Sequence, residues 1–131
     1  MNRIAFRIYD PEKKKFHYSG STPSMLAGYF KNTATLVTIH GMEHQQGTSL
    51  HDKTGREIYE GDIVTGNWYS YEEPTSCVTG IVEYWQGWCA FIIHDAEMKV
   101  LAEMNGHGAY HFEFEVIGNV YENPELLKGA D

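Results

Sequence analysis

Apolar and polar residues alternate near the start of the chain. In the segment 4–9, "IAFRIY", every second residue is Ile or Phe. A period of two in β-branched and aromatic residues is typical of a half-buried strand. The turn sequence "DPEKKK" (10–15) follows, and "FHYSG" (16–20) is predicted to pair back on the first strand as a hairpin.

The pattern after this hairpin is weaker. Thr22 is a good N-cap residue and Pro23 suits the first helical position, which favours a short helix, although Gly28 argues against it. This stretch is therefore ambiguous. The β-branched residues of "TATLVTIH" (33–40) indicate a strand. Residues 41–55 are polar and turn-like.

Strand patterns dominate the second half of the chain. They cover "EIY" (57–59), "IVTGNW" (63–68), "CVTGIVEY" (77–84), "WCAFIIH" (88–94) and "YHFEFEVIGNVY" (110–121). The third and fourth of these segments are expected to form a hairpin whose tip is Trp85–Gly87. Residues 67–76, which contain Pro and two Glu, are expected to form a loop.

Two helical pieces are predicted among these strands. Residues 95–106 suit one short helix, with Asp95 as its N-cap, and "NPELL" (123–127) suits a capped helical turn. Several short strands separated by glycines predict a mainly β fold with a small open SH3-like barrel over roughly residues 50–123. We expect residues 1–49 to form an N-terminal β-hairpin and connecting segment packed on the barrel. Residues 50–131 would then form the barrel and a C-terminal turn.

Composition and charge restrict the class of partner. The chain has 131 residues, of which 42% are hydrophobic and 14% aromatic, enough for one packed domain. Residues 1–40 hold six Lys or Arg against two acids, about +4, whereas residues 41–131 hold four against sixteen, about −12. An acidic body disfavours binding to nucleic-acid phosphates.

The sequence also indicates where the protein works. It has no apolar run long enough to span a bilayer, and its first residues lack the apolar segment of a signal peptide. We expect a cytoplasmic protein without a membrane association, in which Cys77 and Cys89 are reduced thiols.

Two histidine pairs resemble metal-binding motifs. "HGMEH" (40–44) matches the H-x-x-E-H pattern, whose chemistry needs both histidines one turn apart on a helix. Gly41 and the preceding β-branched residues argue against a helix, so a loop is predicted. In "HGAYH" (107–111), a strand would place the two histidines ~13 Å apart, too far for one metal ion. We therefore predict no metal, no cofactor and no catalytic residue.

The thiols offer one alternative. Cys77 and Cys89 do not form a C-x-x-C motif, but either could pair with His94 as a nucleophile and its base. The sequence shows no accompanying oxyanion or orienting group. A hydrolase with an unrecognised site stays an alternative on this ground, and buried or half-buried thiols are the favoured interpretation.

The stretch "GREIYEGDIVTG" (55–66) is interpreted as a structural turn. Gly61 lies between two acids immediately before an apolar pair, where a positive φ suits a tight turn into a buried strand. Asp62 can accept hydrogen bonds from nearby backbone N–H groups. Gly55 is expected to serve the preceding "DKTG" turn in the same way.

An aromatic cluster supplies the candidate interaction face. Trp68, Tyr69, Tyr71 and Trp85 lie at or near predicted loops, beside polar and acidic residues. Tyr and Trp combine a large apolar area with a polar group, which suits them to protein contacts. The alternative is that Trp68 and one tyrosine simply close the end of the barrel.

Four segments together resemble the YopX family. They are "FRIYDPEKKKFHY" (6–18), "GTSLHDKTGREIYEGDIV" (47–64), "TGIVEYWQGWCAFII" (79–93) and "EVIGNVYENPELL" (115–127). One departure is Ser49, where the family usually has glycine before the leucine. The resemblance implies a mainly β fold with a small barrel and a phage or prophage origin. It implies no activity, because the family is functionally uncharacterised.

These observations favour a non-enzymatic phage or prophage accessory protein, a protein-interaction module that self-associates. Its partner is expected to be another copy of the chain, or a host or phage protein, in the host cytoplasm. A nucleic-acid-binding β-barrel is the alternative, and it would need Arg or Lys beside exposed aromatic residues.

Overall fold

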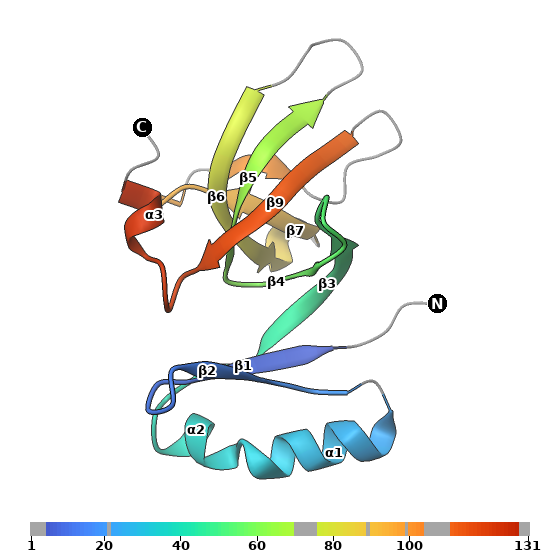
Figure 1. Ribbon diagram of the computed structural model, residues 1–131, viewed down its shortest axis with the longest axis vertical. Helices are drawn as coiled ribbons and strands as arrows, with labels where there is room; N and C mark the ends of the chain where they lie inside the picture. Colours follow the sequence, from blue (N-terminus) through green and yellow to red (C-terminus); the bar gives the residue numbers. More distant parts are fainter. Residues whose placement is uncertain are drawn as a thin grey trace. The chain divides into compact units, whose positions relative to one another are not determined.

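The computed structural model describes residues 5–20, 22–69, 76–88, 90–98, 100–103 and 111–128. The chain divides into two compact units, Met1–Ser49 and Leu50–Asp131. The structure is mainly β, as predicted, with one sheet of strand order β2-β1-β3-β4 and one of order β8-β7-β6-β5-β9 (Figure 1). The predicted packing of residues 1–49 on the barrel stays a prediction.

The first unit is built on a β-hairpin. Strands β1 (Phe6–Asp10) and β2 (Lys15–Tyr18) pair antiparallel, as the sequence predicted, and the start of β3 (Gln45–His51) pairs with β1. Helices α1 (Pro23–Asn32) and α2 (Ala34–Thr38) lie together on one side of this hairpin (Figure 1). The core between them holds Ile8, Tyr29 and Leu36, with Phe6 and Met42 packed against it.

The first helix resolves the ambiguity left by the sequence. The Thr22 hydroxyl accepts a hydrogen bond from the Met25 N–H at 3.2 Å, and Pro23 occupies the first turn. These are the two start signals that the sequence contains. The Cβ that Gly28 lacks would meet no atom within 4 Å, so glycine at this position serves no close contact.

The strand predicted for residues 33–40 was wrong, because the chain forms α2 there. The helix has five residues, too short to be stable by itself, and it buries Leu36 in the core of the first unit. The Thr38 hydroxyl donates to the Ala34 carbonyl at 3.0 Å. Tertiary packing of Leu36 therefore overrides the strand propensity of the β-branched residues.

The turn predicted for residues 41–55 also needs correction, because β3 occupies residues 45–51 of it. Its polar composition concealed the strand, in which Gln45 and Thr48 are buried. Ser49, the departure from the family pattern, has φ 67°, a left-handed conformation in which glycine is favoured. The glycine usual in the family therefore fits the backbone at this position.

The second unit is built on the open, curled five-stranded sheet. The elements of this unit are β4 (Glu57–Tyr59), β5 (Asp62–Tyr69), β6 (Ser76–Trp85), the 3₁₀ turn η1 (Gln86–Trp88), β7 (Ala90–His94), β8 (Val100–Glu103), β9 (His111–Asn119) and helix α3 (Glu125–Lys128). Strand β7 crosses behind β5 and β9 in Figure 1, because the sheet curls into a half-barrel. The open barrel, the β6–β7 hairpin and the C-terminal helical turn are thus confirmed.

The inner face of the half-barrel forms the core of the second unit. Its buried residues are Ile58, Val64, Val82, Phe91, Ile93, Phe114 and Val116. Phe114 and Val116 alternate with Glu115 along β9, as the period of two predicted. The core therefore draws on β4, β5, β6, β7 and β9.

The helix predicted for residues 95–106 was wrong. The Asp95 carboxylate accepts a hydrogen bond from the Glu97 N–H at 2.9 Å, and Met98 N–H donates to the Asp95 carbonyl at 3.1 Å. Met98 has φ 68°, which a continuing helix does not allow. Asp95 thus closes a tight turn, and the chain enters β8. Of the helices in the described part of the chain, none has the length and apolar character needed to cross a membrane.

Candidate functional site

Within the stretch 55–66, Glu60 and Gly61 form the turn that joins β4 to β5. Gly61 has φ 83°; its N–H donates to the Val82 carbonyl at 2.8 Å, and its carbonyl accepts from the Val120 N–H at 2.9 Å. The Asp62 side chain is fully buried and accepts a hydrogen bond from the Tyr59 N–H at 2.8 Å. Glu60 Oε2 accepts from the Tyr84 N–H at 3.2 Å. Glu60, Gly61 and Asp62 therefore all bond to the backbone here, in keeping with the structural interpretation of this motif.

Asp52 accepts four hydrogen bonds in the second unit. Its Oδ1 accepts from Thr54 N–H at 2.9 Å, from the Thr54 hydroxyl at 2.6 Å and from Arg56 N–H at 3.0 Å. Its Oδ2 accepts from Val116 N–H in β9 at 3.0 Å. Burial raises the pKa of Asp52, but these hydrogen bonds outweigh burial and lower it to about 2.

The same turn closes one edge of the half-barrel. Lys53 N–H donates to the Phe114 carbonyl at 2.9 Å, next to the contact between Asp52 and Val116. The backbone of residue 53 and the side chain of residue 52 thus act on β9 as a neighbouring strand would. Sequence reasoning identified Gly55, which has φ 93° in this turn, but missed Asp52.

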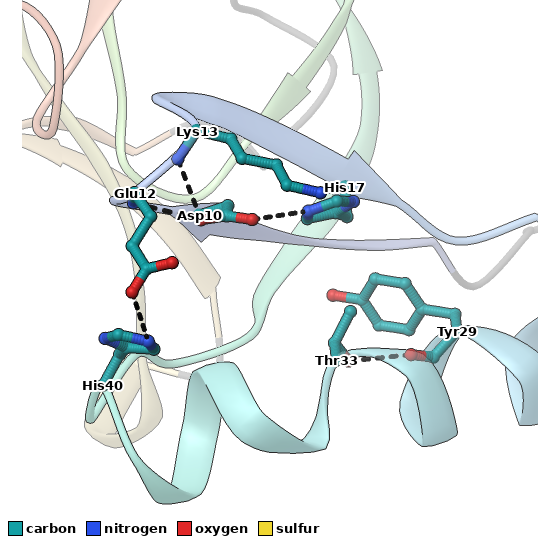
Figure 2. Close-up of polar contacts among 7 residues, drawn as sticks. All are labelled: Asp10, Glu12, Lys13, His17, Tyr29, Thr33 and His40. Atoms are coloured by element: carbon teal, nitrogen blue, oxygen red, sulfur yellow. Dashed lines mark hydrogen bonds and ion pairs between the residues drawn. The ribbon is translucent and has the colours of Figure 1, made fainter.

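The first unit contains an aspartate–histidine pair at the hairpin (Figure 2). Asp10 Oδ1 accepts from the N–H groups of Glu12 and Lys13, each at 3.1 Å, and Asp10 Oδ2 lies 3.1 Å from His17 Nε2. The hydrogen bond with His17, followed by that with Lys13, lowers the pKa of Asp10 below its ordinary value. The pair orders the hairpin turn. Catalysis would also need a nucleophile, and none contacts His17 among the described residues.

The histidines of "HGMEH" have separate partners. His40 Nε2 lies 3.5 Å from Glu12 Oε1 (Figure 2), whereas His44 Nδ1 lies 2.8 Å from the Tyr29 hydroxyl. Burial lowers the pKa of His44. Residues 41–44 are not helical, so the geometry of the zinc motif is absent. Across the described ranges, no three His, Cys, Asp or Glu side chains are grouped to hold a metal ion.

The second unit contains a histidine–glutamate pair, in which His94 is buried. His94 Nε2 lies 2.9 Å from Glu83 Oε1, and His94 Nδ1 lies 2.7 Å from the Asp95 carbonyl oxygen. The sequence offered His94 as a partner for Cys77 or Cys89. Cys89 lies outside the described residues, and so do residues 107–110 of "HGAYH". In the structure, His94 Nε2 is engaged by Glu83.

The predicted aromatic face is described only in part. Trp68 and Tyr69 are the last residues of β5, paired with Phe112 and His111, so the expected loop position of Tyr69 was wrong. Strand pairing with β9 extends β5 beyond the point at which the polar sequence suggested a loop.

The remaining members of the predicted face are Trp85 and Tyr71. Trp85 ends β6 opposite Ala90, is half-buried, and has its ring 6.2 Å from that of His94. Tyr71 lies outside the described residues. The candidate interaction face stays a prediction.

Comparison with protein families gives one finding that covers almost the whole chain. The family model described as YopX protein matches residues 5–128. This match confirms the resemblance found in the four sequence segments. No curated protein matches the chain.

Proposed function

The chain belongs to the YopX family, and from this premise we propose that it is a phage or prophage accessory protein that works as a self-associating protein-interaction module. Four outer strands end the two described sheets: β2, β4, β8 and β9. The proposal rests on one observation: these four strands are not equally protected against pairing with another chain. Outer strands expose backbone groups that can pair with another chain, and monomeric proteins protect them.

Three of the outer strands have a recognisable protection. The outer side of β9 is engaged by Asp52 and Lys53. Strand β4 has only three residues, and Tyr59 N–H is bonded to Asp62. Strand β2 begins at Lys15 directly after two further exposed lysines. Short length and nearby lysines both oppose pairing between chains.

Strand β8 is the least protected of these strands, because a single lysine, Lys99, stands directly before it, whereas three lysines lie at the start of β2. It contains Val100–Glu103, with neither Pro nor Lys within it, and β7 is its one partner in the sheet order. Met98, two residues before it, exposes 52% of its surface. An outer strand can pair antiparallel with a copy of itself about a two-fold axis, so that each chain contributes the same surface. A second copy is therefore the proposed occupant.

The charge distribution supports a protein rather than a nucleic-acid partner. The unit that contains β8, Leu50–Asp131, holds fifteen acids against four bases. This arrangement repels a phosphate backbone. The engagement of Asp52, Asp62 and Asp10 by backbone N–H groups supports a structural role for these acids rather than acid–base catalysis.

The test is the oligomeric mass of the purified chain, measured by light scattering, and its response to proline in β8. Successive strand residues in regular register direct their N–H groups to opposite sides, so Ala102→Pro and Glu103→Pro, at positions that pair with Ile93 and Ile92, form a matched pair. One substitution removes an N–H that faces β7 and lowers stability. The other removes an outward N–H, and we expect that variant to melt like wild type and to be monomeric.

A monomeric wild-type protein at all concentrations would contradict self-association itself. A dimer that persists in the folded proline variant would place the contact elsewhere. The aromatic residues are then tested with the double variant Tyr69→Ser, Tyr71→Ser. If those residues form the contact, the melting temperature holds while the oligomeric mass falls. If they only close the end of the barrel, stability falls instead.

A further inference from the structure

We propose that the turn lysines Lys13–Lys15 and the exposed side chains of Val37 and Ile39 form one docking surface of the first unit, and that its occupant is an acidic polypeptide segment with an aliphatic side chain. This surface is called the basic end below. It belongs to a different unit from β8, so the inference goes beyond self-association and does not depend on it.

A contact between the β1–β2 turn and the end of α2 brings the two parts of the basic end together. His40 Nε2 lies 3.5 Å from Glu12 Oε1, and Figure 2 shows these two side chains pointing toward each other. Lys13 follows Glu12 in the chain, and Ile39 precedes His40. The lysines and the aliphatic residues are therefore parts of one surface.

The register of the hairpin places Lys15 on the same side as α2. Lys15 pairs with Asp10, and the next pair that faces this side is Ile8 with His17. Ile8 packs in one core cluster with Leu36 of α2, so this side of the hairpin faces the helices. Lys15 therefore begins β2 on the helix side.

The three lysines are exposed, and little nearby charge opposes them. Asp10 exposes only 7% of its surface, and its carboxylate contacts His17. Glu12, the exposed acid of the turn, has the contact with His40. Among the described residues, neither contact takes up a lysine side chain. The turn thus presents three positive charges against one exposed acid.

Lys14 stands where the backbone does not favour a lysine. Its φ is 53°, in the left-handed region that glycine, asparagine and aspartate adopt more readily. The geometry of the turn therefore does not account for a lysine at this position, whereas a charge needed for binding does. Residues 1–40 carry about +4 in a chain of net charge −8, so the positive charge is gathered in this part of the sequence.

Ile39 supplies the apolar part of the basic end. It exposes 73% of its surface, more than any other large hydrophobic residue in the described part of the chain, and Val37 exposes 38%. Helix α2 packs into the unit through Leu36, so neither exposed residue is needed for that packing. Aliphatic side chains gain by leaving water, and lysines gain by facing carboxylates. A partner that is both acidic and aliphatic meets both needs.

The same chemistry favours a polypeptide over other anionic partners. Single-stranded nucleic acids stack on aromatic side chains. The aromatic residues of β2, Phe16 and Tyr18, alternate with Lys15 and so face the opposite side of the hairpin. An anionic bilayer takes up a wider apolar face than Val37 and Ile39 provide.

The test is fluorescence anisotropy of a dye-labelled peptide of glutamates around a central leucine, titrated with the full chain. We expect binding that weakens as the salt concentration rises. A second peptide with Gln for Glu lacks the charge, and a third with Ser for Leu lacks the apolar contact. Each should bind about fivefold or more weakly than the first.

Lys14→Glu and Ile39→Ser are the diagnostic variants. Lys31→Glu and Met25→Ser are their matched controls, because they make the same changes at exposed positions of α1. We expect the diagnostic variants to bind the first peptide about tenfold more weakly, and the controls to bind it like wild type. Thermal unfolding checks that each variant is folded; if one is not, the three peptides with wild type still decide.

No binding of the first peptide at low salt, or equal binding of the three peptides, would overturn the inference. Equal losses in the diagnostic and control variants would do so too, since the contact would then be nonspecific. Tighter binding of oligothymidylate, or of vesicles containing phosphatidylglycerol, would assign the basic end to a nucleic acid or to a membrane instead.

Discussion

Replacing Asp52 with alanine tests whether one side chain closes the half-barrel. The substitution removes all four hydrogen bonds that the carboxylate accepts, three within the turn and one from Val116 in β9. Val116 is buried, with 8% of its surface exposed, so its N–H is left without an acceptor. Desolvating such a group without a partner costs about 1–3 kcal/mol. With the loss of the turn, we expect a total of about 3 kcal/mol.

The pH dependence gives a second, independent value for the stability that the Asp52 carboxylate contributes. The pKa of Asp52 falls from 3.8 to about 2 on folding, a shift that is worth about 2 kcal/mol at ~1.4 kcal/mol per unit. The neighbouring turn residues are exposed, so solvent screening reduces this to about 1–2 kcal/mol. Because the folded-state pKa is depressed, this stability is present above pH 3.8 and is lost as the pH falls toward about 2.

The assay is urea unfolding of wild type, Asp52→Ala and Asp52→Asn between pH 7 and low pH. Glu97→Gln is the control, because it changes an exposed carboxylate outside this turn. Both Asp52 variants should be less stable than wild type at neutral pH and should lose the acid-dependent slope that Asp52 supplies. Wild-type stability and an unchanged slope in Asp52→Ala would refute the reasoning, since the four contacts would then contribute nothing.

Three further predictions concern other parts of the chain. Gly61→Val should destabilise the protein by about 1 kcal/mol or more, measured by thermal unfolding, because φ is 83° and the residue is buried between Val82 and Val120; an unchanged melting temperature would count against the turn. Burial depresses the pKa of His44 below 6.5, so the stability that this residue contributes is present above pH 6.5 and is lost as the pH falls below it. His44→Gln should therefore flatten the dependence of unfolding on pH in the first unit. Protein purified without an affinity tag should carry far less than one zinc per chain by elemental analysis; stoichiometric zinc lost on His40→Ala would revive the zinc motif.

The elements that sequence reasoning identified are those whose signal is local. The period of two in β1 and β9 and the β6–β7 hairpin depend on neighbouring residues, and so does the Thr22–Pro23 helix start, which the sequence contained but left ambiguous. The turn at Gly61 is local as well, since glycine between two acids suggests a positive φ by itself.

The elements that sequence reasoning missed depend on residues that are distant in the chain. Helix α2 exists because Leu36 packs on Ile8, and the polar strand β3 exists because Gln45 pairs beside Arg7 and its amide oxygen accepts from the Arg7 Nε at 2.8 Å. Asp52 and Val116 are 64 residues apart, and the identity of Asp52 does not reveal this contact.

The candidate site likewise depends on both local sequence signals and contacts between distant residues. The sequence singled out His94 only as a possible base for Cys77 or Cys89, not as a partner of Glu83. Its pairing with Glu83 follows from the register of β6 and β7, which sets Ile81 opposite His94 and Glu83 opposite Ile92. A sequence-based analysis that fixes this hairpin register would bring the two side chains to neighbouring positions on the two strands.

The turn from Asp52 to Arg56 also bears on how this chain tolerates change. Residues 53–56 are all exposed, and exposed loops ordinarily accept substitutions and insertions with little cost. Here the spacing is set at both ends, because Asp52 holds Thr54 and Arg56 while Lys53 meets Phe114. One inserted residue would shift this turn out of register with β9, the strand that Asp52 and Lys53 contact. Insertions in this exposed turn should therefore be tolerated as poorly as changes in the core, so solvent exposure is a poor guide to where a tag or a new loop can be placed.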